Sequence, residues 1–384
     1  MSRAYLDHAS WSPLRTAARE AMVEWLGRND VGDPGRLHSE ALVARDALET
    51  ARERVARCLG ARPREVVFTS GHAESVAMAC FGVASSRGPG SIHSAVEHSA
   101  VREWAARGQP IVAPVDSAGR LDVDVVGAVL DGSGAAQFGS VEEGVASVAL
   151  VHCQLGNHEV GTRQPVARVV EVVDGRALVH VDAAAAAGLE EISFDGSGVD
   201  LLSLGSWELG GPVGVGVLLV RRGLRLPPLL VGGDQERAWR AGLEDIAGVL
   251  GFAAALEEVS GRRDEEAGAA RRRTARLVDA VEGMDGVSVH GDPTDRLAHV
   301  VCLGFDDVEP QPVLIGLDRA GIAVHSGSSC SSEALEPSPV LAAMGLDAER
   351  SLRVSVGWSS SDEDVERFIE ELPKVLGDLR ALRV

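Results

Sequence analysis

The chain is 384 residues long, which exceeds the ~250–300 residues at which one hydrophobic core stops growing, so we expect two domains. Its formal net charge of −20 argues against nucleic-acid binding, because a phosphate backbone requires a basic face. No apolar stretch approaches the ~20 residues that span a bilayer, and the first residues lack the apolar core of a signal peptide. We therefore predict a cytoplasmic protein without membrane contact.

Helical patterns alternate with short apolar runs bounded by Gly, Asp or Pro, which is typical of βα units around a mostly parallel sheet. In chain order, we expect a helix over 40–59, then a strand from Glu65 that runs into a glycine turn at Gly71, and a helix over 74–81. Such a turn directs backbone N–H groups towards an anion. Further strands are expected over 147–152, 177–182, 201–204 and 213–220.

A long helical region over about 246–282, interrupted near Ser260 and Gly261, is expected to join a large domain to a smaller one. The smaller domain opens with a strand over 299–305. We predict that residues 16–250 form the large domain, and that residues 1–15 and 251–384 form the small one.

Four motifs stand in order along the chain, Glu-His-Ser-Ala-Val at 97–101, Asn-His-Glu-Val-Gly at 157–161, His-Val-Asp-Ala-Ala at 180–184 and Ser-Gly-Ser-Ser-Cys-Ser-Ser at 326–332. With these motifs the chain resembles the cysteine desulfurases, which belong to the aminotransferase class V group of pyridoxal phosphate (PLP) enzymes. The resemblance implies the α/β architecture of the fold-type I PLP-dependent transferases. In that architecture a large domain has a mostly parallel sheet flanked by helices, a smaller C-terminal α/β domain follows, and the protein is a homodimer.

The family's chemistry needs a lysine that forms a Schiff base with PLP, an aspartate that keeps the pyridine nitrogen protonated, and a mobile cysteine that attacks the substrate sulfur. The resemblance assigns the aspartate to Asp182, the side chain that stacks on the ring to His98, and the nucleophile to Cys330. It also includes Asn157 among the retained cofactor-binding positions.

The position of the lysine is occupied by Glu208, in a segment whose flanks align without a gap. The only lysine in the whole sequence is Lys374, in a C-terminal helical stretch. A carboxylate at position 208 would also lie near the phenolate and phosphate of PLP, where like charges oppose binding.

Other positions implied by the resemblance have changed as well. Hydroxyl groups that hold the phosphate are replaced at Ala73, Gly205 and Leu243, a glutamine is replaced by Ala185, and the arginine that grips the substrate carboxylate is replaced by Trp358. We therefore expect that no cofactor is bound, although PLP is the cofactor of the family. Trp207 and Trp358 are both bulky, and we expect them to fill part of the vacated space.

Cys330 is flanked by small polar residues, and its thiolate could accept or pass on sulfane sulfur. The alternative is an inherited surface cysteine without a role. A second group of residues, of metal-ligand type, could suggest a metal site. Its spacing follows no metal-binding motif, so remnants of a cofactor pocket or buried histidines are the simpler interpretation. This group comprises His98, His152, Cys153, His158, His180 and Asp182. We predict no metal site, and we interpret Cys58, Cys80 and Cys302 as core residues.

The sequence thus predicts a cysteine desulfurase-like protein without the Schiff-base lysine, which transfers sulfur as a persulfide carrier through Cys330 or acts as a scaffold for a sulfur-relay partner. One alternative is an active desulfurase or lyase with atypical cofactor use. Another is a structural or regulatory partner of an active paralogue. We expect a homodimer and a sulfur-donor or sulfur-acceptor protein as partners.

Overall fold

A seven-stranded sheet forms the centre of the larger part of the molecule. The computed structural model describes residues 3–133, 147–326 and 337–382. All neighbouring strands of the sheet are parallel except β8, which runs antiparallel to both of its neighbours. The order across the sheet is β2 (Val66–Thr69), β8 (Gly216–Val220), β7 (Leu201–Gly205), β6 (Leu178–Asp182), β5 (Val148–Gln154), β3 (Gly90–Ser94) and β4 (Gln109–Ala113).

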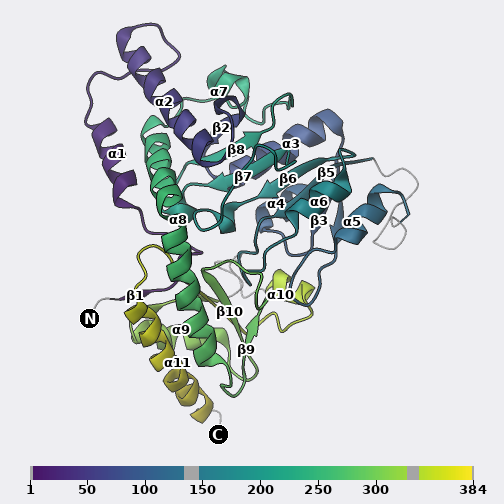
Figure 1. Ribbon diagram of the computed structural model, residues 1–384, viewed down its shortest axis with the longest axis vertical. Coiled ribbons are helices and arrows are strands. Elements are labelled where there is room, and N and C mark those ends of the chain that lie inside the picture. Colours follow the sequence, from purple (N-terminus) through teal and green to yellow (C-terminus); the bar gives the residue numbers. More distant parts are fainter. Residues whose placement is uncertain (1–2, 134–146, 327–336, 383–384) are drawn as a thin grey trace.

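Helices cover both faces of this sheet, so its strands are apolar on both sides (Figure 1). Side chains alternate between the faces along β2: Val66 and Phe68 join the core cluster of one face, and Val67 joins that of the other. The first face packs against α2 (Ser39–Cys58), α5 (Val123–Leu130), α6 (Val166–Val173) and the start of α8 (Ile246–Val281). The second face packs against α3 (His72–Arg87) and α4 (Ser99–Ala105).

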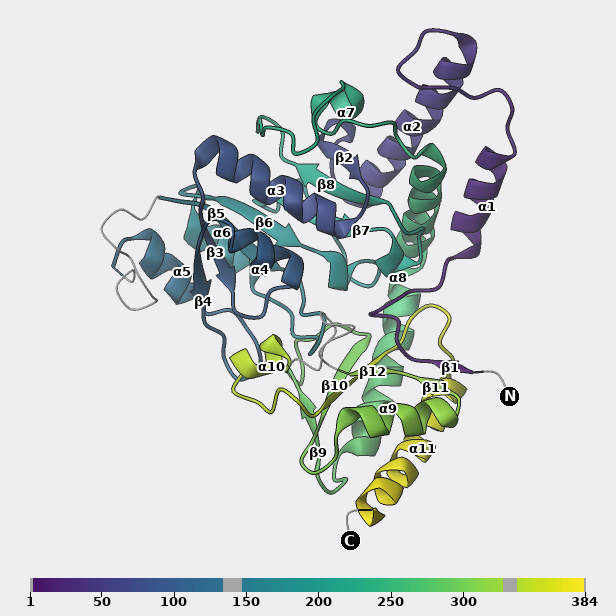
Figure 2. The same cartoon turned by 180° about the vertical axis from the view of Figure 1, so that it is seen from behind.

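A four-stranded antiparallel sheet forms the smaller part, with its own hydrophobic core (Figure 2). Its strand order is β12 (His325–Ser326), β13 (Ser351–Ser355), β10 (Val300–Phe305) and β9 (Val287–His290). The helices α9 (Pro310–Arg319) and α11 (Asp362–Ala381) pack on it, and near the chain start β1 (Ala4–Tyr5) pairs with β11 (Ile322–Ala323). The remaining helices of the described chain are α1 (Thr16–Leu26), α7 (Gln235–Ala238) and α10 (Pro339–Ala343).

Helix α8 links the two parts and runs without the interruption that we expected near Ser260 and Gly261. A glycine inside a helix costs about 1 kcal/mol relative to alanine. Buried side chains on either side of Gly261, such as Phe252 and Leu277, pack into the two cores and outweigh that cost.

The predicted α/β fold class is confirmed, with a mixed, mostly parallel central sheet flanked by helices. The domain limits that we gave remain a prediction. Within the described ranges, no helix is both long enough and apolar enough to pass through a bilayer.

Candidate functional site

A cavity of about 680 Å³ lies where strand ends of the large sheet meet the small sheet. Gln154 and Asp182, the last residues of β5 and β6, line it, as does Glu208 just after β7. Arg353 of β13 and the following Trp358 line it from the other side. The carboxyl ends of parallel strands are where open α/β sheets bind ligands, so this cavity is the candidate site.

Asp182 and His72 form a buried ion pair in the wall of this cavity. The Nε2 atom of His72 lies 2.8 Å from Oδ1 of Asp182, which also accepts a hydrogen bond from the backbone N–H of Ala184 at 3.0 Å. Burial opposes both charges, but the attraction between them prevails. It raises the pKa of His72 to about 9 and holds the pKa of Asp182 well below its usual range, so the pair is ionised at neutral pH.

Glu208 lacks such a partner. It lies in the short helical turn Trp207–Leu209, and its Oε2 atom is buried without a hydrogen-bond partner in the described chain. Burial raises the pKa of Glu208 to about 7, and the charge of Asp182 also raises it, whereas the charge of His72 lowers it. Glu208 therefore changes its charge near neutral pH.

Gly205 provides the space that the Glu208 carboxyl group occupies. A Cβ atom added at Gly205 would lie 2.2 Å from Oε2 of Glu208 and 2.7 Å from Oε1. These distances are far below van der Waals contact, so any side chain at position 205 would displace the carboxyl group. The two departures from the family pattern that the sequence shows here, Gly205 and Glu208, are thus coupled in space.

His98 and His158 form the next layer of the site. The rings of His72 and His98 meet edge to face with centroids 5.3 Å apart, and those of His98 and His158 meet in the same way at 5.1 Å. Burial lowers the pKa of His98 to about 3 and that of His158 to about 4, so both rings are neutral. The Nδ1 atom of His98 accepts the backbone N–H of Ala100 and thereby caps α4.

Only some members of the group that could suggest a metal site in the sequence lie at the cavity. His98, His158 and Asp182 line the cavity. His152 and His180 do not. Their Nδ1 atoms lie 2.9 Å apart in the interior, and Nε2 of His180 lies 3.0 Å from the Ser203 hydroxyl. The remaining member, Cys153, is buried in the main core.

Asn157 is fully buried, and its contacts are with the backbone. Its Oδ1 atom accepts the N–H groups of Glu159 and Val160, and its Nδ2 atom donates to the carbonyl of Val96. It is absent from the residues that line the cavity within the described chain. Its role as a cofactor-binding residue remains a prediction, and its observed contacts shape the loop after β5.

The cavity arginines are already paired. Arg15 donates to both oxygens of Glu266, at 2.9 and 2.6 Å, and its guanidinium lies 5.3 Å from the Trp358 ring. Arg353 donates to the carbonyl of His158 at 3.0 Å. Trp358 lines the cavity, and its Nε1 donates to the carbonyl of Pro13.

Cys330 lies outside the described residues. His325, five positions before it, lines the cavity. Of the predicted core cysteines, Cys80 and Cys302 are buried, and Cys58 is partly buried against the main core.

His72, which carries a positive charge next to Asp182, was not predicted from the sequence. Its signal is its position: it follows the Ser70-Gly71 turn and is the first residue of α3, where a strand-turn-helix unit presents groups to a ligand.

Comparison with known proteins shows similarity along nearly the whole chain. The cysteine desulfurase IscS 1 of Archaeoglobus fulgidus is 34% identical over 385 residues, covering 98% of both chains. The IscS-like cysteine desulfurase of Mycobacterium tuberculosis is 36% identical over 397 residues, covering 98% of this chain and 97% of its own. Among solved structures, a NifS-like protein superposes with a TM-score of 0.87 at 28% identity over 98% of this chain and 100% of the other.

These findings correct our expectation that no cofactor is bound. The relatives at about 34% identity are named cysteine desulfurases, a class of PLP-dependent enzymes, and nothing in the comparisons indicates a missing cofactor. The expectation rested on the single lysine, Lys374, and on side-chain changes at Glu208 and several other positions, and these changes do not outweigh similarity over the whole chain.

The residues of the cavity fit one part of PLP and not another. His98 and Asp182 line the cavity where the resemblance places the ring, and the backbone at the start of α3 faces it as a phosphate site would. Where the resemblance implies an amine for the covalent anchor, the chain has the buried carboxyl group of Glu208. The donor set therefore suits a cofactor held by contacts rather than by a covalent bond to lysine.

The sequence profile of the aminotransferase class-V family matches residues 4–368, which is nearly the entire chain. Together with the relatives and the superposed structure, this match identifies the chain as a member of the aminotransferase class-V family, of the cysteine desulfurase type.

Proposed function

We propose that this protein transfers sulfur through Cys330 without the lysine-dependent step of its relatives. The observation that carries the proposal is the place of the chain's single amine-bearing side chain. Lys374 lies on α11, is largely exposed and pairs with Glu371 at 2.8 Å. Glu208, which occupies the lysine position that the resemblance implies, lines the cavity. A chain that keeps the cysteine motif but lacks the amine is suited to receive sulfur that another protein has mobilised.

The transfer follows ordinary thiol chemistry. The Cys330 thiolate attacks the outer sulfur of a persulfide on a donor protein, the S–S bond of the donor breaks, and the donor leaves as a thiolate. The product is a persulfide on Cys330. The exchange needs no oxidant or reductant, because the sulfane sulfur only changes its carrier.

Intact-mass measurement tests this proposal. The protein is incubated with an active cysteine desulfurase and cysteine, and we expect the mass of one added sulfur atom on the wild type and none on Cys330→Ser. Cys58→Ser is the matched control, because Cys58 is only partly buried and would be the next thiol to react. It should gain the adduct like the wild type. A wild-type protein that gains no sulfur contradicts the proposal.

A second candidate is a desulfurase or lyase that uses PLP held without a covalent bond. The cavity of about 680 Å³, with Asp182 and His98 in its wall, favours it. When bound, PLP supplies an electron-accepting ring for chemistry at an amino acid's α-carbon. Release of alanine from cysteine by the protein supplied with PLP supports this candidate, and its absence at any PLP concentration leaves sulfur relay.

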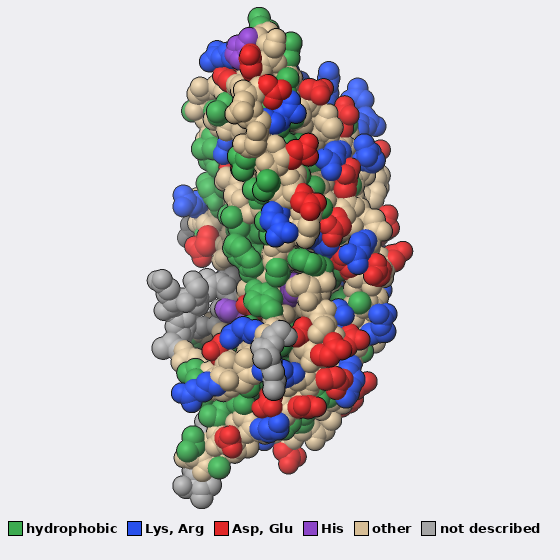
Figure 3. Space-filling model, turned by 90° about the vertical axis from the view of Figure 1, so that its left-hand side faces the viewer, with side chains coloured by type: hydrophobic (Ala, Val, Ile, Leu, Met, Phe, Trp, Pro, Cys, Tyr) green, Lys and Arg blue, Asp and Glu red, His purple; other side chains and the backbone are tan. Residues whose placement is uncertain are grey.

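Two copies of the chain are proposed to associate through the face that carries α1. Apolar side chains are exposed there, and Figure 3 shows a band of them on this face. Exposed apolar side chains on α1 and just before it are Trp11, Leu14, Val23 and Leu26. Light scattering should give a dimer for the wild type and for Ile315→Glu, an exposed apolar position on α9, but a monomer for Val23→Glu with Leu26→Glu. A monomeric wild type that pairs with an active paralogue would favour the regulatory alternative.

The cytoplasmic location remains a prediction.

A further inference from the structure

Glu208 is a carboxyl group of the cavity wall that makes no ion pair with another side chain of the described chain. Its Oε2 atom is buried and lacks a hydrogen-bond partner among the described residues. Buried acids are normally paired, because an ionised carboxyl group without a partner is costly to remove from water. Glu208 therefore marks a place in the cavity for a donor or a cation that a ligand brings.

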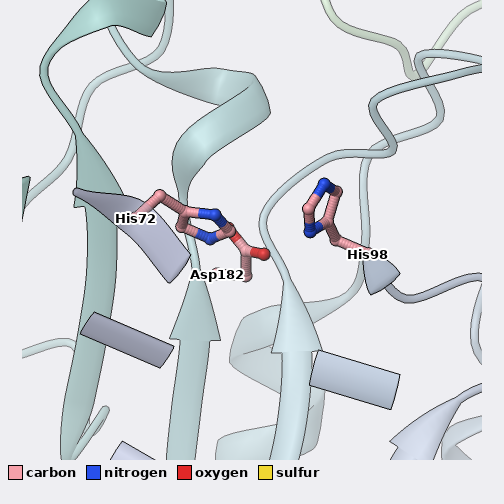
Figure 4. A group of neighbouring side chains, drawn as sticks. All are labelled: His72, His98 and Asp182. Atoms are coloured by element: carbon pink, nitrogen blue, oxygen red, sulfur yellow. The ribbon is translucent and has the colours of Figure 1, made fainter. Parts of the chain in front are cut away.

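The cationic imidazole of the site already has a partner. Figure 4 shows the His72 ring beside the Asp182 carboxyl group, with His98 next to them. One nitrogen or oxygen atom from each of the three lies within 4.8 Å of the others. Nε2 of His72 contacts Oδ1 of Asp182 at 2.8 Å, and Nδ1 of the neutral His98 ring accepts the Ala100 N–H. Burial raises the pKa of Glu208 more than the charge of His72 lowers it, so His72 does not act as the partner of Glu208.

The arginines that line the cavity also serve other acids. Arg15 donates to Glu266 at 2.9 and 2.6 Å, and Arg353 has Asp7 at 3.3 Å. Both guanidinium groups are thus committed to other carboxyl groups. A cation of a ligand meets Glu208 without competition from them.

The position of Glu208 indicates which part of a ligand carries that charge. The resemblance implies a lysine at this position, which condenses with the aldehyde group of PLP. A carboxyl group forms no such bond, but it accepts strong charge-assisted hydrogen bonds from an ammonium group. With acid and amine exchanged between protein and cofactor, the complementary ligand bears an aminomethyl group where PLP bears its aldehyde. This ligand is pyridoxamine phosphate, which keeps the ring and the phosphate of PLP.

We propose that the cavity binds the cofactor in its amine form, pyridoxamine phosphate, and that Glu208 selects this form by accepting hydrogen bonds from its ammonium group. The ring and the phosphate keep the places that the resemblance assigns to them, at His98, Asp182 and the start of α3. The inference deepens the second candidate function, because it rests on a cofactor held without a covalent bond. It does not depend on sulfur transfer by Cys330.

A comparison of two ligands tests the selection. Pyridoxamine phosphate and pyridoxine phosphate differ only in an ammonium group against a hydroxyl group, and neither has an aldehyde that condenses with protein amines. In calorimetric titrations at about pH 8, the wild type should bind the amine form at least about tenfold more tightly. In Glu208→Gln, which keeps the size of the side chain, the two affinities should agree within about threefold. Glu265→Gln is the matched control, because Glu265 pairs with Arg262 on the exposed side of α8 and should leave the tenfold preference unchanged.

The same ratio of affinities at lower pH gives a second readout. The charged groups that act on Glu208 are His72 from α3 and Asp182 from β6. Neither changes its charge between about pH 6 and 8, because the pKa of His72 is about 9 and that of Asp182 is far below its usual range. Glu208, with a pKa of about 7, becomes mostly protonated at about pH 6. The preference for the amine form should therefore largely disappear there, while the phosphate that both ligands share cancels in the ratio.

Titration with cysteine alone distinguishes the cofactor from an amino acid as the source of the ammonium group. Binding of cysteine that depends on Glu208, with no preference between the two phosphates, overturns the proposal. Equal affinities of the two phosphates for the wild type, or a preference that survives Glu208→Gln, overturn it as well. No binding of either phosphate or of PLP overturns both this inference and the second candidate function. The sulfur adduct on Cys330 is measured separately by mass, so a failure of sulfur transfer is distinguishable from these results.

Discussion

Two carboxyl groups of the same cavity, Asp182 at the end of β6 and Glu208 in the turn after β7, behave in opposite ways. Both are removed from bulk water, yet the pKa of Asp182 is far below its usual range and that of Glu208 is raised to about 7. Asp182 has His72 at 2.8 Å, whereas Oε2 of Glu208 has no hydrogen-bond partner in the described part of the chain. Burial alone therefore does not set the charge of this site. The position of one imidazole does.

The comparison also shows how the site differs from the pattern that the family resemblance implies. There the cation would be a lysine at position 208. Here the cation is His72 on α3, and position 208 holds an acid.

Removing the Asp182 carboxyl group from the His72–Asp182 ion pair should have the largest effect on stability. Asp182→Ala leaves the His72 cation without its partner, and we expect a loss of about 3–5 kcal/mol in the free energy of unfolding. Urea unfolding near neutral pH in a chelator measures it. Asp279→Ala, an exposed position on α8, is the control and should change stability by less than about 0.5 kcal/mol. A similar small change for Asp182→Ala would show that the ion pair does not matter.

Removing the acid at position 208 should instead increase the stability of the folded protein. Since the folded-state pKa of Glu208 is raised from 4.5 to about 7, the folded protein binds this proton more tightly than the unfolded chain. Its contribution is therefore complete below about pH 4.5 and is lost as pH rises through 7. Glu208→Gln should stabilise the protein by up to about 3 kcal/mol near pH 8 and by little near pH 4.5. A stability difference that does not depend on pH would contradict this assignment.

A double-mutant cycle at positions 205 and 208 sharpens the comparison. Gly205→Ala crowds the Glu208 carboxyl group and should cost about 1–3 kcal/mol. In a Glu208→Ala background the same change meets open space and should cost about 1 kcal/mol less. Equal costs in the two backgrounds would mean that Gly205 does not make room for Glu208.

The smallest effect is expected at the chain's only lysine. Lys374→Ala removes an exposed pair with Glu371 on α11 and should change stability by less than about 0.5 kcal/mol. It should also leave PLP binding to the protein unchanged, as measured by absorbance after dialysis. A loss of bound PLP would show that Lys374 reaches a cofactor site.

The sequence predicted the central strands well because they are continuous apolar runs, such as Leu178–Asp182 and Leu201–Gly205. It did not predict β3 and β4, whose short segments include His93 and Pro110 and do not have that composition. The break expected in α8 was wrong, since packing on both cores outweighs one glycine. Motif order located Asp182, His98 and Glu208 at one cavity.

The chemistry of the site was harder to predict than its location. The His72–Asp182 pair joins residues far apart in sequence, and only the tertiary structure shows their 2.8 Å contact. The coupling of Gly205 with Glu208 depends on side-chain direction, which spacing does not give. The expectation of no cofactor was wrong because it weighed single positions above whole-chain similarity.

Histidine titration by NMR in metal-free buffer tests the central claim most directly. With His72→Gln used to assign its signal, the ring of His72 should titrate with a pKa of about 9, while the rings of His98 and His158 stay neutral from about pH 5 upwards. A His72 ring that titrates at or below its ordinary value of 6.5 would show that this residue does not supply the cavity's positive charge.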